Sequence, residues 1–385
     1  MQKIYFDNSA TTKMSDKAKE KMVEVIENHF GNPSSLHDVG LDAEHVKEDA
    51  RKIILATLGI QRGVRGELVF TSGGTESNNM AILGVVNSKN RRGNEKILIT
   101  AGEHSSVEET CQALTKKGFT VLRVPTVGGK LDIDFIRENG KDVILASFMH
   151  VNNETGALYN LKEAFDTVKA LSPQCVTHAD CVQSYMKVKF TKKSINADLI
   201  TLSAHKINGA KGVGALYISP EIIKAKKLVP IVYGGGQEEN IRSGTENVYG
   251  IVAFGEAARE HYSKLNEEIE KMARVRTYIA DKLSDTEVRL NIPERFAPHI
   301  INITLPGIRS ETMLHFLSSR GVYVSSGSAC SSHSSKVSSA LTAFGIDPKL
   351  ADSSIRASFC PDNTIEEADI FISALLDGIK SLQRK

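Results

Sequence analysis

The chain has 385 residues, of which 41% are hydrophobic and 24% are charged, and its formal net charge is +2. These values are ordinary for a globular protein, and they give no electrostatic reason to expect a nucleic acid or a membrane surface as a partner. The length allows one large domain or two. Because no apolar run is long enough for a membrane helix and the N-terminus has no signal-peptide core, we expect a cytoplasmic protein.

Five cysteines lie at positions 111, 175, 181, 330 and 360. They form no CxxC pair, so the sequence predicts neither a zinc site nor a disulfide framework. Reduced thiols are the simplest interpretation. The composition leaves open whether one of these thiols is reactive.

The N-terminal part of the chain is predicted to begin with a short extended segment and small polar residues at 5–12 and to continue as helices up to a first long strand. Apolar residues at helical spacing indicate helices at 15–30 and 41–58, separated by the helix-breaking stretch GNPSS at 31–35. A strand at 67–70 then runs into the turn TSGGTE at 71–76, and a helix follows. Free N–H groups and the positive end of the helix dipole make such a turn a site for an anion. The turn lacks the lysine of a P-loop and the GxGxxG pattern, so it favours a phosphate group over a nucleotide, with a plain helix cap as the alternative.

Strands and helices alternate from residue 96 onward. Strands are predicted at 96–100, 120–124, 143–149, 176–179, 199–203 and 215–218, with helices near 107–117, 132–138 and 161–170. This alternation indicates a mainly parallel sheet that helices cover on both faces. In such folds, functional groups collect at the carboxyl ends of the strands.

Polar side chains follow strand after strand at that edge of the predicted sheet. They are Thr75, His104, Asn152, Asn153, Asp180, Gln183 and Lys206. Lys206 can be an ordinary surface amine, which this stretch alone favours, or a desolvated nucleophile whose pKa burial lowers. An anion site, a lysine, an aspartate and a histidine at one edge, however, suit pyridoxal phosphate. That cofactor needs an amine for its aldehyde, a carboxylate for its ring nitrogen and donors for its phosphate.

The C-terminal part of the chain has a different pattern. A long amphipathic helix is expected at 249–283, and an α+β region follows it. That region has predicted strands at 299–305, 322–324 and 354–359 and predicted helices at 311–320 and from 364 onward. A loop of small polar residues at 325–335 carries Cys330. We therefore predict a large domain over 16–258 and a small domain formed by 1–15 and 259–385, which carries the Cys330 loop.

Short motifs occur along essentially the whole chain. They are DNSATT at 7–12, GNPSSLH at 31–37, FTSGGTESNN at 70–79, EH at 103–104, MHVNNETG at 149–156, HADCVQ at 178–183, SAHKINGAKGVGALY at 203–217, RSGTEN at 242–247, SSGSACSS at 325–332 and SSIRAS at 353–358. Together they resemble the class V aminotransferase family, and specifically its cysteine desulfurases of the NifS/IscS type. The resemblance implies an α/β protein of the PLP-dependent transferase fold type I, with a mainly parallel seven-stranded sheet in the large domain and a smaller α+β domain.

The resemblance also implies a role for each residue that matches a family motif. Lys206 would bind pyridoxal 5'-phosphate as an imine and take the Cα proton of the substrate. His104 would stack on the cofactor ring and shuttle protons, and Arg356 would bind the substrate carboxylate. The other implied contacts are Asp180 to the pyridine nitrogen, Gln183 to the ring hydroxyl, Gly74, Thr75, Ser203 and His205 to the phosphate, Asn153 to cofactor and substrate, and Thr245 to the phosphate of the neighbouring subunit in a homodimer.

The implied reaction converts L-cysteine to L-alanine. Cys330 would take the sulfur as a persulfide and pass it to an acceptor protein, in iron–sulfur cluster assembly or a thiolation pathway. A lone cysteine is more often a small buried hydrophobe, which is our interpretation of the other four cysteines, including Cys181 beside Asp180. Two alternatives remain open: another PLP enzyme of this fold, such as an aminotransferase or a selenocysteine lyase, and a non-enzymatic scaffold that relays sulfur.

Overall fold

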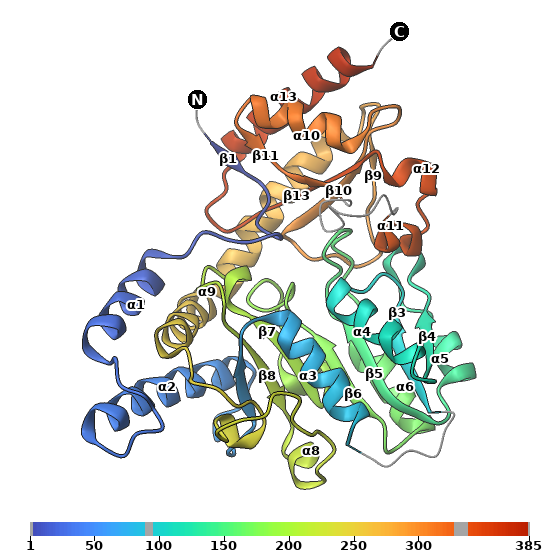
Figure 1. The fold of residues 1–385 in the computed structure, drawn as a ribbon. Helices are drawn as coiled ribbons and strands as arrows, with labels where there is room; N and C mark the ends of the chain where they lie inside the picture. Colours follow the sequence, from blue (N-terminus) through green and yellow to red (C-terminus); the bar gives the residue numbers. More distant parts are fainter. Residues whose placement is uncertain (1–2, 89–94, 327–337, 384–385) are drawn as a thin grey trace.

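The computed structural model describes residues 3–88, 95–326 and 338–383, which form a larger and a smaller lobe (Figure 1). The larger lobe is built on a seven-stranded sheet with the strand order β2-β8-β7-β6-β5-β3-β4. The strands are β2 (Leu68–Thr71), β3 (Lys96–Thr100), β4 (Thr120–Val124), β5 (Val143–Met149), β6 (Val176–Asp180), β7 (Leu199–Ser203) and β8 (Gly214–Ile218). β8 runs antiparallel to β2 and β7, and the other neighbours pair in parallel, so the prediction of a mainly parallel sheet is confirmed.

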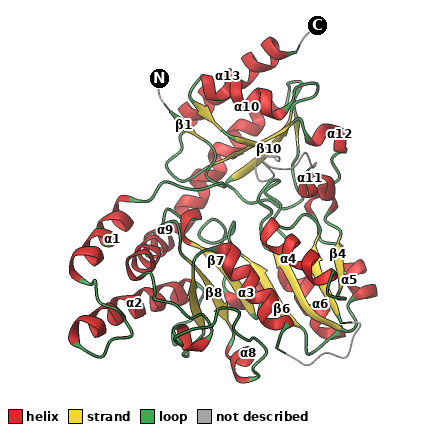
Figure 2. Cartoon of the chain, viewed as in Figure 1, coloured by secondary structure: helices red, strands yellow, loops and turns green. Residues whose placement is uncertain are grey.

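Side chains of the central strands alternate between two hydrophobic cores, one on each face of the sheet. In β3, Ile97 and Ile99 pack into one core and Leu98 packs into the other. In β8, Leu216 packs into the same core as Ile97, and Tyr217 packs into the same core as Leu98. Because both faces are covered by helices (Figure 2), the strands are apolar on both sides and not on one side alone.

Each face has its own set of helices. The first core, which contains Ile97 and Ile99, is covered by α3 (Gly74–Val86), α4 (Ser105–Thr115) and α8 (Pro220–Lys224). The second core is covered by α1 (Asp16–Asn28), α2 (Asp38–Thr57), α5 (Ile133–Asn139), α6 (Leu161–Leu171), α7 (Lys192–Ile195) and the first part of α9 (Val248–Leu283).

The smaller lobe contains a four-stranded antiparallel sheet with the order β12-β13-β10-β9. Its strands are β9 (Arg289–Leu290), β10 (Ile300–Thr304), β12 (Ser325–Ser326) and β13 (Ser354–Ser358), while β1 (Ile4–Tyr5) pairs in parallel with β11 (Val322–Tyr323). The helices are α10 (Ser310–Ser319), α11 (Ser339–Phe344), α12 (Pro348–Ala351) and α13 (Ile365–Leu382). The ring of Phe6 meets those of Phe359 and Phe371 at centroid distances of 5.0 and 5.6 Å, so the N-terminal segment belongs to the core of this lobe.

The long helix α9 belongs to both lobes, in agreement with the helix predicted at 249–283. Phe254, near its start, packs into a core of the larger lobe, and Met272 and Ile279 pack into the core of the smaller one. The helix passes through residue 258 without a break. The division into a 16–258 domain and a domain of 1–15 with 259–385 therefore stays a prediction.

The sequence pattern misses the shortest elements. The strand predicted at 322–324 is β11, whereas β12 lies at the start of the stretch predicted as a loop, and the two strands join different sheets. The two-residue strand β9 is also missed, because so short a segment has no readable periodicity, and β1 overlaps only the start of the extended segment expected from residue 5. Within the described part of the chain, we find neither a helix with the length and apolar character needed to span a membrane nor a group of three acidic, cysteine or histidine side chains arranged for a metal ion.

Candidate active site

A cavity of about 410 Å³ lies where the two lobes meet, at the carboxyl ends of the parallel strands. Asp180 from the larger lobe and Ser326 and Arg356 from the smaller lobe all line it. The structure brings together in this cavity the predicted residues Gly74, Thr75, His104, Asn153, Asp180, Gln183, Ser203, His205, Lys206 and Arg356. Gly74 and Arg356, which are 282 positions apart in the sequence, thus share one site.

Lys206 reaches the cavity from the short helix η2 (Ala204–Lys206), which directly follows β7. Its Nζ donates hydrogen bonds to the carbonyl oxygens of Ser9 and Ala10, at 2.5 and 2.8 Å. The backbone N–H of Thr12 donates in turn to the carbonyl of His205 at 2.9 Å. The N-terminal DNSATT segment therefore lies against the lysine turn and fixes where the amine can lie.

Asp180 is the last residue of β6, and its side chain is buried and held by two donors. The backbone N–H of Val182 donates to Oδ1 at 3.0 Å, and Nδ2 of Asn78 donates to Oδ2 at 2.7 Å. Two donors fix the plane of the carboxylate, so Asp180 can present a negative charge in one defined direction.

His104 caps the N-terminus of α4. Its Nδ1 accepts a hydrogen bond from the backbone N–H of Ser106 at 3.2 Å and lies 2.8 Å from the Ser106 hydroxyl. Burial lowers the pKa of His104; nearby Asp180 opposes this effect and Lys206 adds to it. The imidazole is therefore neutral at neutral pH.

One end of the cavity is suited to an anion. Thr75 lies in the first turn of α3, where the helix dipole is positive. A Cβ on Gly74 would lie 2.8 Å from Val182 Cγ2, so only glycine allows the helix to begin this close to the loop after β6. Ser203 adds a hydroxyl, and His205 adds an imidazole whose pKa is lowered to about 4, first by burial and then by Lys206.

Arg356 lies on β13 and faces the cavity from the smaller lobe. Its Nη1 donates to the carbonyl of Asn153 at 2.7 Å, and its Nη2 donates to Oδ1 of Asp7 at 2.9 Å. Its Nε has no partner among the described residues. The guanidinium is thus held in position with donor capacity to spare.

Five buried polar atoms of the cavity residues lack a hydrogen-bond partner in the described part of the chain. They are the Ser9 Oγ, the Asn78 Oδ1, the Gln183 Oε1, the Ser203 Oγ and the Arg356 Nε. Leaving a buried polar atom unpaired costs about 1–3 kcal/mol, so native proteins rarely do so without a reason. Their concentration around one cavity indicates a site built for a polar, anionic ligand.

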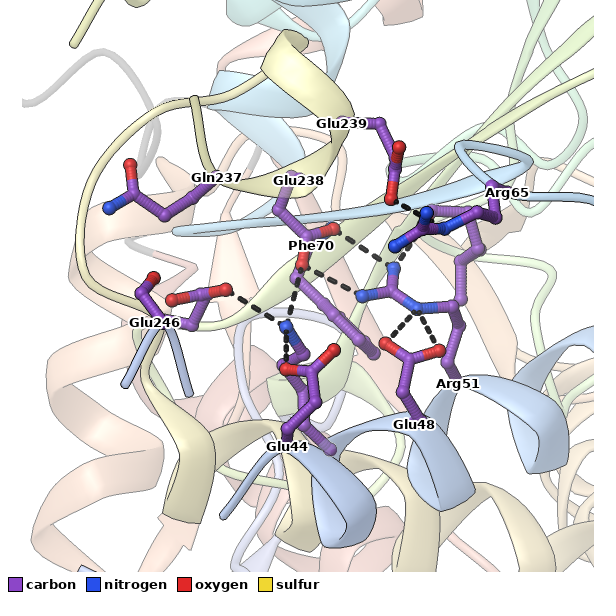
Figure 3. A network of polar contacts seen from close by, with 12 residues as sticks. Glu44, Glu48, Arg51, Arg65, Phe70, Gln237, Glu238, Glu239 and Glu246 are labelled. Carbon is purple, nitrogen blue, oxygen red and sulfur yellow. Dashed lines mark hydrogen bonds and ion pairs between the residues drawn. The ribbon is translucent and has the colours of Figure 1, made fainter. Parts of the chain in front are cut away.

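Thr245 is the predicted site residue that the structure places elsewhere: it does not line the cavity, and it is exposed. Ion pairs with α2 hold the loop that carries it (Figure 3). Lys47 donates to Glu246 at 2.9 Å, and Arg51 forms a two-pronged pair with Glu238 at 2.8 and 2.9 Å. Within its own chain, Thr245 therefore does not contribute to the cavity.

Cys330, the predicted sulfur acceptor, lies outside the described residues. Asn78 and Ser106 are among the cavity residues for which the sequence predicts no role. Asn78 belongs to the quoted TESNN motif and comes one helical turn after Thr75, which is the signal that could have placed it at the cavity.

Comparison with known proteins identifies the family. The sequence profile described as "Aminotransferase class-V" matches residues 4–371. The chain is 39% identical to a NifS/IcsS protein homolog from Lactobacillus delbrueckii subsp. bulgaricus, over 96% of each chain. It is 36% identical to the putative cysteine desulfurase IscS 1 of Bacillus subtilis, over 99% of this chain and all of the relative. The solved structure of a NifS-like protein superposes with a TM-score of 0.91 at 32% identity and covers 99% of this chain and 100% of that one. The chain therefore belongs to the class V aminotransferase family and, within it, to the group of NifS- and IscS-type proteins.

Proposed function

We propose that this protein is a PLP-dependent cysteine desulfurase, which converts L-cysteine to L-alanine and passes the sulfur on as a persulfide of Cys330. The observation that carries the proposal is the meeting of Lys206, Asp180, His104 and Arg356 at one cavity in a chain whose relatives include named cysteine desulfurases.

The cavity residues fit pyridoxal 5'-phosphate. The unpartnered Ser203 Oγ and the first turn of α3 suit its phosphate, and the unpartnered Gln183 Oε1 suits its ring hydroxyl. Asp180 would face the ring nitrogen, and Lys206 would hold the cofactor through its aldehyde. When bound, the cofactor supplies an electron-poor ring that weakens the bonds at the substrate Cα.

The chain's own residues then have separable tasks. Arg356 binds the carboxylate of L-cysteine, and the Lys206 amine takes the Cα proton and returns a proton to the product. The Cys330 sulfur attacks the substrate sulfur, so an S–S bond forms while the C–S bond of the substrate breaks. L-cysteine and the Cys330 thiol thereby become L-alanine and a Cys330 persulfide, with no external oxidant.

A second copy of the chain would complete the site. Phe30, Leu36 and Tyr233 are 76%, 92% and 81% exposed, and the loops next to them line a second cavity of about 600 Å³. Large exposed apolar side chains are typical of protein interfaces. In a homodimer that covers this face, Thr245 would reach the cofactor phosphate of the neighbouring subunit.

The sulfur acceptor would be a protein of iron–sulfur cluster assembly or of a thiolation pathway, in the cytoplasm. There the low potential of the thiol pool keeps cysteines reduced. Cys111, Cys175, Cys181 and Cys360 are all free thiols, as such a compartment requires.

The proposal predicts that the purified protein, loaded with pyridoxal phosphate and incubated with L-cysteine, forms L-alanine. The alanine should appear in equal amount to the sulfur recovered as persulfide and sulfide, because each turnover releases one of each. Mass spectrometry of the digested protein should find one added sulfur atom on the peptide that contains Cys330. Formation of pyruvate or of a keto acid in place of alanine would contradict a desulfurase.

Arg356→Lys should raise the KM for L-cysteine roughly 10- to 100-fold, because lysine cannot reproduce a two-pronged hydrogen bond to a carboxylate. Steady-state kinetics with L-cysteine measure this effect. Arg309→Lys is the matched control, since Arg309 lies in the same lobe with a 79% exposed side chain. An unchanged KM in Arg356→Lys would remove Arg356 from substrate binding.

A further inference from the structure

We propose that Ser106 and Asn78 are positioning residues that hold His104 as the neutral tautomer protonated on Nε2, so that His104 offers the cavity an N–H donor and not a base. The consequence for catalysis rests on the proposed function, whereas the hydrogen bonds from which the tautomer is inferred do not depend on it. It concerns a chain of hydrogen bonds that runs from Asp180 through Asn78 and Ser106 to His104.

Asp180 fixes the orientation of Asn78. The two side chains are 2.7 Å apart, and a carboxylate can only accept a hydrogen bond, so the Asn78 atom at that distance must be Nδ2. Turning the amide over would bring Oδ1 against the carboxylate. Asn78 is 1% exposed, and its Oδ1 has no partner among the described residues, so the contacts of Nδ2 alone decide the orientation.

Asn78 in turn fixes the orientation of the Ser106 hydroxyl. The amide Nδ2 has two hydrogens; one goes to Asp180, and the other goes to Ser106 Oγ at 2.8 Å. The hydroxyl oxygen of Ser106 therefore accepts. Its single proton is left to donate to His104 Nδ1, which lies 2.8 Å away.

Two donors thus converge on His104 Nδ1: the hydroxyl of Ser106 and, at 3.2 Å, the backbone N–H of the same residue. An atom that accepts in this way carries no proton. Because burial also keeps the ring neutral, its one proton lies on Nε2. Nε2 has no hydrogen bond to the described residues, and His104 lines the cavity, so this N–H is available to a ligand there.

The arrangement limits what His104 can do. To act as a base through Nε2, the ring would first have to move its proton to Nδ1, which would break both hydrogen bonds from Ser106. The proton shuttle that the family resemblance assigns to His104 therefore works against this chain of contacts. The charged groups that act on the ring, Asp180 and Lys206, have opposite effects on its pKa, so the hydrogen bonds from Ser106 are the contacts that distinguish the two ring nitrogens.

The test is a long-range ¹H–¹⁵N spectrum of the holoenzyme labelled with ¹⁵N-histidine, which distinguishes protonated from unprotonated ring nitrogens. The signals of His104 are assigned by their loss in His104→Gln. We expect a protonated Nε2 and an unprotonated Nδ1 at neutral pH. In Ser106→Ala, the Nδ1 signal should move and the fraction of the Nδ1-protonated tautomer should rise. The kcat for L-cysteine should fall roughly tenfold without a change in KM, the size expected for one lost hydrogen bond.

Ser106→Thr keeps the hydroxyl and should restore both the spectrum and kcat. Ser105→Ala, at the exposed neighbouring position, controls for a change at the start of α4. A protonated Nδ1 in the unmodified protein, or a Ser106→Ala spectrum identical to that of Ser105→Ala, would overturn the proposal. Failure of the unmodified holoenzyme to form alanine would instead overturn the proposed function, and the spectrum would still decide the tautomer.

Discussion

Lys206→Ala should lower the rate of alanine formation from L-cysteine by roughly 10⁴-fold or more. The change removes both the amine that would hold the cofactor and the group that would move the Cα proton, and proton transfer by a positioned side chain alone contributes about 10²- to 10⁴-fold. Among the described residues that line the cavity there is no second lysine, and the buried Lys187 does not line it. Alanine formation under saturating L-cysteine measures the loss.

A loss of activity in Lys206→Ala has to be distinguished from a loss of folding. Lys206 Nζ contributes two hydrogen bonds to carbonyl oxygens of the N-terminal segment, so circular dichroism and the midpoint of thermal unfolding must be compared with those of the unmodified protein. Lys211→Ala, which alters an exposed lysine of the same loop, is the matched control and should keep its activity. Added methylamine should restore part of the activity of Lys206→Ala. A variant that folds and turns over at the normal rate would remove Lys206 from the mechanism.

The sequence predicts the larger lobe well because its signals are strong and local. The strands at 143–149 and 199–203 are predicted to the residue, since long apolar runs between helical patterns leave little choice. The direction of β8 is not predicted, because an apolar run reads the same for a parallel and an antiparallel neighbour. The smaller lobe is predicted less completely, since the two-residue strands β9 and β12 are too short to have a readable pattern.

The residues of the candidate site also differ in whether the sequence predicts them. Residues at the carboxyl ends of strands, such as Asp180 and Lys206, are predictable because topology alone brings those ends together. Asn78 and Ser106 are not, because their roles come from contacts across 102 and 28 positions of sequence. Lys187 is a further surprise: it is 5% exposed, and burial lowers its pKa to about 7, although lysines are rarely buried.

The four cysteines other than Cys330 are free thiols that the protein buries fully or in part. Cys111, Cys175 and Cys181 are buried, as expected for small packed side chains. Burial raises the pKa of Cys111 and Cys175 to about 12, and it also raises the pKa of Cys181 and Cys360. The thiolate is the reactive form of cysteine, so these four are poor nucleophiles at neutral pH. These properties agree with the proposal that sulfur transfer belongs to Cys330 and not to the other four cysteines.

Cys330→Ala should abolish sulfide release from L-cysteine and the added sulfur found by mass spectrometry, while the absorbance of the bound cofactor stays unchanged. The described residues on both sides of the segment at 327–337 are tied to the cavity. Ser326 lines it, and the Ser338 hydroxyl donates at 2.6 Å to Glu154, which also lines it. The substitution leaves Lys206 and Asp180 untouched, so the cofactor should bind as before. Cys360→Ala, which alters a partly exposed thiol in the same lobe, should release sulfide at the normal rate. Normal turnover in Cys330→Ala would show that the sulfur leaves by another route, and the persulfide mechanism would then have to be abandoned.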